Sequence, residues 1–278
     1  MEEIAVLYSG GTDSTCAAAL MLREFDRVRL LTYRRFGLFS INNIKKNVTL
    51  LKEKFGKNKI THTVIKFDML FKYLSYSNYF HYLKRYNFFL LSTCGLCKLS
   101  MHIRTLIYCL ENNIKYVCDG STRYSGNNYY PAQMTKVLDE IKAMYKQYNI
   151  EFLTPVYDFD EPDNIEWFDK LGLRKIRILN LNNGQGRVNK TAGEVLFDMK
   201  IFSQKNVKGT IFDKKMQARC FQLILFNLFL YWYYLPIYGE QKYIDTAHKF
   251  FKEKIKDSNS FVEKYLENIK NVNNIIEE

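Results

Sequence analysis

A short segment near the start of the chain combines two glycines, three hydroxyl side chains and one carboxylate. It reads SGGTDS and comprises Ser9, Gly10, Gly11, Thr12, Asp13 and Ser14. Glycine lets a backbone turn tightly and come close to a bound anion. The segment follows the apolar run of residues 4–8 and precedes a helical pattern, so free backbone N–H groups and the positive end of a helix dipole meet it. This arrangement predicts a phosphate-binding loop.

The carboxylate of Asp13 sets this loop apart from the commoner phosphate loops. The loop lacks the Gly-Lys-Ser/Thr ending of a Walker A motif and the GxGxxG spacing of a dinucleotide fingerprint. A carboxylate inside an anion site is favourable when it binds a metal ion that the phosphates also bind. We therefore expect Asp13 to act through a divalent cation on the phosphate ligand.

Two thiols, Cys94 and Cys97, stand two residues apart in CGLCK at the predicted start of a helix. Such a pair can bind a metal ion or form a redox pair, and a helix N-terminus lowers the pKa of nearby thiols. Cys220 is the third thiol that can join them. The alternative for Cys220 is that it packs in the core, and the alternative for the CxxC pair is that it has no function. The remaining thiols lie where predicted helices and strands would bury them, and these are Cys16, Cys109 and Cys118.

A second polar segment follows the predicted strand of residues 115–118. It consists of Asp119, Gly120, Ser121, Thr122 and Arg123. Because the carboxyl ends of parallel strands meet at one edge of a sheet, we expect this segment to lie beside the SGGTDS loop. Its hydroxyls and the Arg123 guanidinium suit contact with phosphate or substrate. The alternative is an ordinary polar turn.

The elements that must position these residues are strands that alternate with helices over the first 160 residues. Strands are predicted at residues 4–8, 28–33, 61–67, 115–118 and 152–157, and helices at 14–24, 41–55, 96–112 and 134–148. This alternation predicts an α/β fold with a Rossmann-like, doubly wound parallel sheet. The later part is mainly helical, with a polar loop at residues 180–186. We therefore divide the chain into a nucleotide-binding domain, residues 1–160, and a helical extension, residues 161–278, for substrate binding or dimerisation.

The segment SGGTDS resembles the SGGxDS signature of the PP-loop ATP pyrophosphatase superfamily, the adenine nucleotide alpha hydrolase-like enzymes. That superfamily includes the GMP, asparagine and NAD synthetases, lysidine synthetase, the tRNA thiolases and 7-cyano-7-deazaguanine synthase. The resemblance covers about residues 1–160 and matches every defined position of the signature. It implies a sheet of the PP-loop/HUP type and an enzyme that uses ATP and Mg²⁺. The loop would hold the leaving pyrophosphate while a substrate oxygen takes AMP, with Asp13 needed for that step.

The set Cys94, Cys97 and Cys220 resembles the three cysteines of the iron–sulfur tRNA thiolases. In those enzymes three thiolates hold a 4Fe–4S cluster whose open iron carries the sulfur. The sequence departs from them in the long interval before Cys220 and in having no second CxxC. The resemblance implies a sulfurtransferase that acts on a tRNA base or a small-molecule acceptor, with a sulfur donor protein as a further partner. Zinc, a persulfide relay and no metal are the alternatives for these thiols.

Two other functions fit the same loop. A nitrogen-transferring ligase, similar to 7-cyano-7-deazaguanine synthase, would keep the adenylation and use the cysteines as zinc or structural ligands. A regulatory protein would bind the nucleotide without turnover. Dependence on ammonia rather than sulfide would indicate the first, and ATP binding without pyrophosphate release would indicate the second.

Composition excludes a disordered or fibrous chain. Of the 278 residues, 47% are hydrophobic and 25% are charged, as in globular proteins. The net charge of +12 attracts polyanions such as nucleic acid or ATP, although a solvated lysine-rich surface is the alternative. Residues 240–278 contain 7 lysines against 8 acidic residues, so the positive excess lies in the first 239 residues.

The cysteines and the apolar residues bear on location and assembly. Six cysteines without a disulfide-like spacing, and an N-terminus without a signal-peptide pattern, predict a cytoplasmic protein. Residues 220–238 are apolar over nearly the length of a membrane span, but Gln222, Asn227 and Pro236 interrupt them. We expect no transmembrane segment there, but a buried helix at a domain or subunit interface, which makes a homodimer possible.

Overall fold

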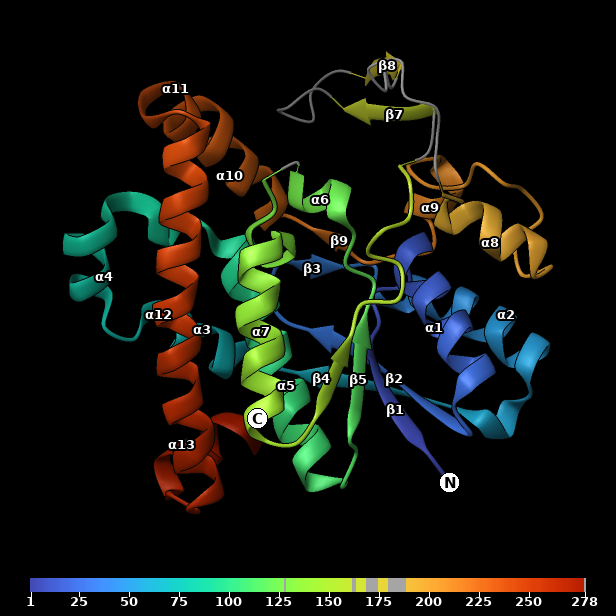
Figure 1. The fold of residues 1–278 in the computed structure, drawn as a ribbon, viewed down its shortest axis with the longest axis horizontal. Helices are drawn as coiled ribbons and strands as arrows, with labels where there is room; N and C mark the ends of the chain where they lie inside the picture. The colour runs from blue at the N-terminus through green and yellow to red at the C-terminus, as the bar shows by residue number, and fades with distance from the viewer. Residues whose placement is uncertain (128, 162–163, 169–174, 180–188, 278) are drawn as a thin grey trace.

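A computed structural model describes the chain except residues 128, 162–163, 169–174, 180–188 and 278. The polar loop expected at residues 180–186 lies outside the described residues. The central element of the fold is a five-stranded sheet with helices on both faces (Figure 1). The predicted α/β class with a Rossmann-like parallel sheet is confirmed.

The sheet has the spatial order β4-β2-β1-β5-β6, and each neighbouring pair is parallel. Its strands are β1 (Glu3–Leu7), β2 (Arg27–Arg34), β4 (Ile60–Lys66), β5 (Tyr116–Asp119) and β6 (Glu151–Leu153). The direction of winding reverses between β1 and β5, and ligands of such sheets bind outside the carboxyl ends of the strands at that point. Leu7 pairs with Asp119, so the loops that follow β1 and β5 start side by side.

The last strand is shorter than the predicted residues 152–157. It ends at Leu153, and the chain then turns, with Tyr157 N–H donating to the Thr154 carbonyl at 3.1 Å. Pro155 explains the early end, because proline has no N–H to donate to a neighbouring strand.

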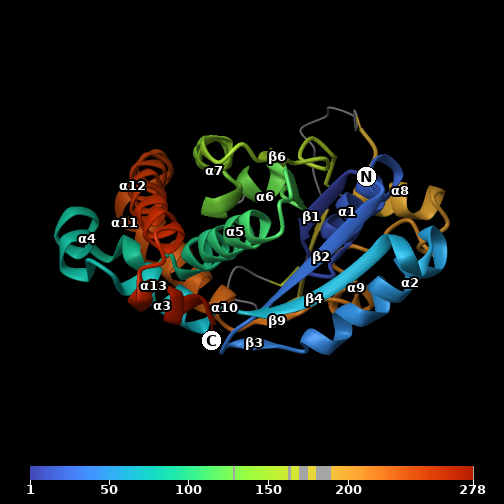
Figure 2. The ribbon, with the colours of Figure 1, turned by 90° about the horizontal axis from the view of Figure 1, so that it is seen from below.

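One face of the sheet is covered by α1 (Thr12–Glu24), α2 (Lys45–Phe55) and α8 (Ala192–Asp198). The other is covered by α5 (Thr93–Glu111) and α7 (Thr135–Gln147), with α12 (Glu240–Leu266) outside them (Figure 2). Alternate residues of β1 point to opposite faces of the sheet. Ile4 and Val6 pack in the core under α1 and α2, and Ala5 and Leu7 pack in the core under α5 and α7. Helices on both faces explain why the strand is apolar throughout.

The C-terminal part shares these cores rather than forming one of its own. Phe226 and Phe250 pack in the same cluster as Leu7 and Val117, and Val207 packs with α1 in the other cluster. The remaining helices are α3 (Asp68–Tyr76), α4 (Tyr79–Tyr86), α6 (Arg123–Asn127), α9 (Ile211–Lys214), α10 (Gln222–Leu228), α11 (Leu235–Tyr238) and α13 (Lys270–Glu277), with 3-10 turns η1 (Ile41–Ile44), η2 (Lys57–Lys59), η3 (Asn87–Leu91) and η4 (Pro131–Gln133). The division of the chain near residue 160 stays a prediction.

Strands also occur in the part expected to be mainly helical. The antiparallel pair β7 (Asn164–Phe168) and β8 (Lys175–Leu179) interrupts it, and β9 (Arg219–Cys220) pairs with β3 (Leu38–Phe39). The sequence KIRIL of β8 alternates polar and apolar residues, which is the period of a strand. The expectation overlooked this pattern because the two strands are only five residues long.

Within the apolar residues 220–238, Cys220 ends β9, and α10, a π-helical turn (Phe229–Tyr234) and α11 follow from Gln222. Phe226 and Leu230 are fully buried, so the expected buried helix is confirmed for one face. The opposite face is exposed, and its large apolar side chains are Phe221, Ile224, Leu225, Leu228, Trp232 and Ile237. Within the described part of the chain, no helix combines the length and apolar character needed to cross a membrane.

Candidate functional site

A cavity of about 370 Å³ opens at the carboxyl edge of the sheet, beyond the ends of β1 and β5. We call it the loop cavity. Four groups of residues line it: the SGGTDS loop, the three thiols with Lys98 beside them, the end of β5 with the glycine that follows it, and a segment from the C-terminal part. The residues used below are Ser9, Gly11, Thr12, Asp13, Ser14, Cys94, Cys97, Lys98, Asp119, Gly120, Lys208, Asp213, Gln217 and Cys220.

The loop is held in a tight turn by close contacts that exclude side chains. Gly10 has a φ of +78°, and a Cβ there would lie 2.6 Å from the Met216 carbonyl oxygen. A Cβ at Gly120 would lie 2.6 Å from the backbone nitrogen of Ser14. Both positions therefore require glycine, and the second shows that the β5 loop lies directly against the start of α1.

Hydroxyl and amide groups fix the conformation of the loop. The Ser9 and Ser14 hydroxyls are 3.0 Å apart and hydrogen bonded, and the Asn47 amide donates to the Gly10 carbonyl at 2.7 Å. Asn47 is fully buried on α2. These hydrogen bonds hold the tight turn that a phosphate loop needs.

Asp213 closes the loop from a segment about two hundred residues away. Its carboxylate accepts from the Thr12 backbone N–H at 3.1 Å and from the Thr12 hydroxyl at 2.7 Å. It also accepts from the Gly209 N–H at 3.0 Å and from the Gln217 amide at 3.2 Å. A buried carboxylate thus lies at the N-terminus of α1, where the helix dipole favours negative charge.

Asp13 is paired with a cation from the same distant segment. Lys208 Nζ donates to its carboxylate, and the Tyr124 hydroxyl donates to both carboxylate oxygens at 3.0 Å. The same ammonium lies 4.1 Å from the centroid of the Tyr124 ring. A carboxylate and a lysine therefore face the cavity together, and a ligand that carries both phosphates and a divalent cation could separate them.

The structure brings the three predicted thiols to the loop cavity. Cys94 and Cys97 lie in the first two turns of α5, whose N-terminus is at the carboxyl edge because the helix runs antiparallel to the strands. Cys220 lies near them because β9 pairs with β3, the short strand that follows β2 in the chain, with Cys220 opposite Leu38. The other three cysteines are buried away from this cavity, as expected.

The expected lowering of the thiol pKa values is wrong. Desolvation raises the pKa of Cys94 to about 12, with the neighbouring thiols Cys97 and Cys220 adding to the shift. Desolvation also raises the pKa of Cys97 to about 11, against the opposing effect of Arg35, whose Nε donates to Cys97 Sγ at 3.1 Å. The cost of burying a thiolate exceeds the gain from the helix dipole and the guanidinium. Both thiols are therefore protonated near neutral pH.

Arg35 is a buried cation that the sequence reasoning missed. Besides contacting Cys97, its guanidinium donates to the Gln222 side chain and lies 4.3 Å from the centroid of the Phe71 ring. These contacts fix the positively charged guanidinium beside the thiols, where it would stabilise thiolates or a bound anionic group.

Asp119 forms a buried network with Lys98 and His102. Its carboxylate is 2.7 Å from Lys98 Nζ and 3.7 Å from His102 Nε2. Burial favours the neutral acid and is the largest single influence, but the charges of Lys98 and His102 and the hydrogen bonds from Lys98 and Ser121 together hold the pKa of Asp119 below its usual value. Burial lowers the pKa of His102 to about 3 despite the opposing charge of Asp119, so the imidazole is neutral. Lys98 is thereby fixed between the thiols and the β5 loop.

The rest of the predicted second segment lies outside the loop cavity. Ser121 and Thr122 are buried, and their hydroxyls donate to Asp119 and Ser125 at 2.6 and 2.8 Å. Arg123 is exposed, pairs with Asp158 and lies over the Tyr157 ring, contrary to its expected place beside the phosphates. The order of residues along a turn does not reveal which side chains face inwards, so the sequence could not separate Asp119 and Gly120 from these three.

The arrangement of the thiols bears on metal binding. Within the residues that the structure describes, no three or more His, Cys, Asp and Glu side chains are grouped to hold one metal ion. The three thiols nevertheless line one cavity, and Cys220 adds to the raised pKa values of both Cys94 and Cys97. Thiols that face one cavity are the donor type that both zinc and iron–sulfur clusters use.

Lys208 and Asp213 are the residues of the loop cavity that sequence reasoning did not find. The only local signal was the helix start at Thr210, whose side chain accepts from the Asp213 N–H at 3.4 Å. Nothing local connects that helix with the SGGTDS loop, because the contact joins residues 201 positions apart.

Comparisons with known proteins add little to these observations. No family model matches the chain, and no curated protein matches it. Among solved structures, the chain is similar to a crystal structure described as a predicted subunit of tRNA methyltransferase from Methanocaldococcus jannaschii. The TM-score is 0.36 at 19% identity, over 58% of this chain and 70% of the other. The fold and the loop cavity therefore rest on this chain's own residues.

Proposed function

We propose that the chain is an ATP-dependent adenylating enzyme, forming AMP and pyrophosphate, that activates an acceptor carbonyl for sulfur insertion. The observation that carries the proposal is that the SGGTDS loop and the three thiols line one cavity. With a sulfur site beside a phosphate loop, the sulfur can attack the activated carbon while both stay in the same cavity. The resemblance of the loop to the PP-loop signature supports ATP as the ligand.

In the first step the acceptor carbonyl oxygen attacks the α-phosphorus of ATP. The bond from that phosphorus to the bridging oxygen breaks, and pyrophosphate leaves with its Mg²⁺. Loop N–H groups would stabilise the charge on pyrophosphate, and Asp13 would bind the metal. Lys208, released from Asp13 by the metal, would turn to the phosphates.

In the second step a hydrosulfide adds to the activated carbon, and AMP leaves with the former carbonyl oxygen. The hydrosulfide proton passes to solvent, so no oxidant or reductant is consumed. Cys94, Cys97 and Cys220 would hold a 4Fe–4S cluster, which when bound presents the sulfur. Arg35 would offset the negative charge of the thiolates.

The acceptor that we propose first is a tRNA base, with a small molecule as the alternative. The net charge of +12 supports a polyanionic substrate. A sulfur donor protein would supply the hydrosulfide in the cytoplasm. The exposed apolar face of residues 221–237 supports a homodimer, which light scattering of the purified protein would detect as twice the chain mass.

The proposal is tested by anaerobic purification, iron and sulfide analysis, and assays of AMP formation with bulk tRNA. We expect a brown protein that forms AMP and thiolated tRNA when ATP and sulfide are present. A colourless zinc protein that uses ammonia instead would replace sulfur transfer by nitrogen transfer. ATP binding without pyrophosphate release on any acceptor would indicate a non-catalytic protein.

Lys208 offers a test that depends on the structure rather than on the resemblance. Lys208→Ala should lower pyrophosphate formation by about tenfold or more, because a charge on the leaving group loses its partner. Lys215→Ala, which removes an exposed lysine of the same segment, is the matched control and should change little. Equal rates for the two variants would exclude Lys208 from the reaction.

A further inference from the structure

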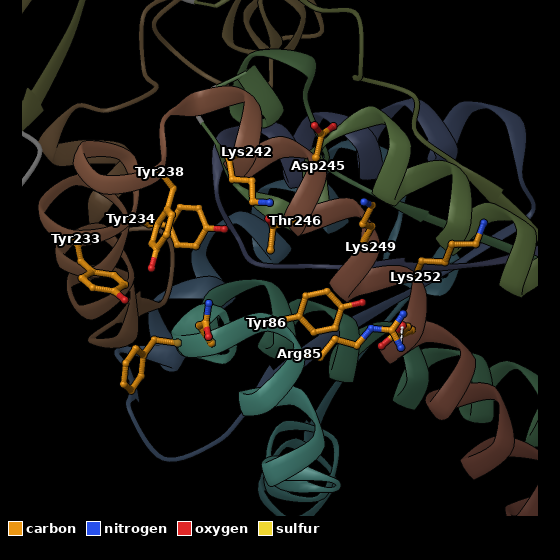
Figure 3. Close-up of a pocket in the computed structure, with 13 residues that line it drawn as sticks. Arg85, Tyr86, Tyr233, Tyr234, Tyr238, Lys242, Asp245, Thr246, Lys249 and Lys252 are labelled. Carbon is orange, nitrogen blue, oxygen red and sulfur yellow. Dashed lines mark ion pairs between the residues drawn. The ribbon is translucent and has the colours of Figure 1, made fainter.

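A second pocket, of about 620 Å³, lies on the outer side of the molecule between α12 and the segment from α4 to η3 (Figure 3). It shares no lining residue with the loop cavity. We call it the lysine–tyrosine pocket after the residues that matter here: Arg85, Tyr233, Tyr238, Lys242, Lys249 and Lys252. Figure 3 shows the tyrosines at one end, Lys249 and Lys252 at the other, and Lys242 between them.

Two of its cations are free to bind an anion. Arg85 pairs with Glu253 and Lys252 with Glu140, each at 2.8 Å. Lys242 and Lys249 are exposed and have no ion-pair partner among the described residues. They are seven residues apart on α12, so they lie on one face about 10 Å apart along the helix axis. That spacing suits a ligand with a row of negative charges rather than a single anion.

The tyrosines supply an aromatic wall beside these lysines. Tyr238 is 38% exposed, and its ring centroid lies 4.9 Å from that of Tyr234 and 6.2 Å from that of Tyr233. The neighbours hold the Tyr238 ring in place while part of it faces solvent. A ring fixed in this way is a stacking surface for a planar, uncharged group.

We propose that the lysine–tyrosine pocket binds single-stranded nucleic acid, with phosphates on Lys242 and Lys249 and a base stacked on Tyr238. Alternating charges and planar rings are the chemistry of a polynucleotide, and the bases of a duplex have no free face to offer. The inference rests on the proposed function in taking RNA as the acceptor, but it needs neither ATP nor the thiols. An acidic peptide would use the lysines without the ring.

Asp245 makes the proposal testable in both directions. It lies between the two lysines on α12 and lines the same pocket, where its carboxylate accepts from the Gln241 amide at 3.2 Å. A carboxylate this close to a bound phosphate repels it. Asp245→Asn should therefore tighten binding, whereas removal of a lysine should weaken it.

The experiment measures the affinity of the full chain, without ATP, for a fluorescent twelve-nucleotide oligouridylate by anisotropy over a range of salt. The double variant Lys242→Ala and Lys249→Ala should bind more weakly and lower the slope of log affinity against log salt by about 1.4. Tyr238→Ala should weaken binding roughly tenfold, while Tyr238→Phe should bind like the wild type. Lys256→Ala, an exposed lysine of α12 outside the pocket, is the control.

Three results would overturn the proposal. The first is unchanged affinity in both the lysine variant and Tyr238→Ala. The second is a loss with the lysine variant alone, which would indicate an acidic peptide or another polyanion. The third is equal competition by a duplex of the same length. Pyrophosphate formation by the same variants on a small acceptor reports separately on the loop cavity, so failure of the proposed function is distinguishable from failure here.

Discussion

The loop cavity and the lysine–tyrosine pocket hold their charged side chains in different ways. In the loop cavity Lys208 is paired with Asp13, Lys98 with Asp119, and Asp213 with backbone and side-chain donors. In the pocket Lys242 and Lys249 stand in solvent without such partners within the described chain. Charges that are paired and largely shielded from solvent are held in fixed positions, which suits chemistry on a fixed phosphorus atom. Exposed charges suit a flexible polymer that can adjust to them.

The largest effect is expected from Asp13→Ala in the loop cavity. AMP and pyrophosphate formation should fall at least about a hundredfold, because the metal on the leaving group loses its ligand. Binding of single-stranded RNA in the pocket should not change. Rates of both products, with circular dichroism to establish folding, check the prediction. Full turnover by a folded Asp13→Ala protein would remove the role assigned to this carboxylate.

The next effect is on stability: breaking an ion pair in the loop cavity should cost more unfolding free energy than breaking one in the lysine–tyrosine pocket. Asp119→Asn should lower the free energy of unfolding by about 3 kcal/mol, because it breaks a buried pair and leaves Lys98 without its partner. Lys252→Ala breaks the exposed pair with Glu140 and should cost no more than about 1 kcal/mol. Urea unfolding of both variants at neutral pH measures the difference. Similar losses would mean that the two regions do not differ as described.

The smallest effect is a dependence of stability on pH that comes from the loop cavity. The pKa of His102 is lowered by burial from 6.5 to about 3 in the folded chain, with Asp119 opposing the shift. Between these values the unfolded chain binds a proton that the folded chain does not. Stability is therefore complete above pH 6.5 and falls as the pH drops, by up to about 1.4 kcal/mol per unit.

The control for this dependence is His102→Gln, which has no proton to gain. Its unfolding free energy, measured in urea from pH 7 to pH 5, should fall less steeply than that of the wild type. Parallel slopes for the two proteins would show that His102 titrates normally in the folded chain. No lining residue of the lysine–tyrosine pocket is a histidine, so we expect no similar pH-dependent contribution to stability from that pocket.

Much of the sheet could be predicted from the sequence, because short apolar runs alternated with helical patterns. The strands β1, β2, β4 and β5 lie within a residue or two of their predicted positions. The exceptions have local causes: Pro155 shortened β6, and the short β7–β8 pair carried too little pattern to be noticed. The apolar residues 220–238 were predicted to form a buried helix, but a helix that packs on one side leaves the other exposed.

The turn of the SGGTDS loop could be predicted from the sequence alone, since its residues are consecutive and its conformation depends on glycines and a helix start. The same holds for the pair Cys94 and Cys97 on one helix. Their meeting with Cys220 was decided by the pairing of β9 with β3. Lys208 and Asp213 reached the loop, and burial raised the thiol pKa values, only through packing of the C-terminal part against the sheet. Contacts between distant residues, and the desolvation that they cause, depend on the whole fold, and no local pattern encodes them.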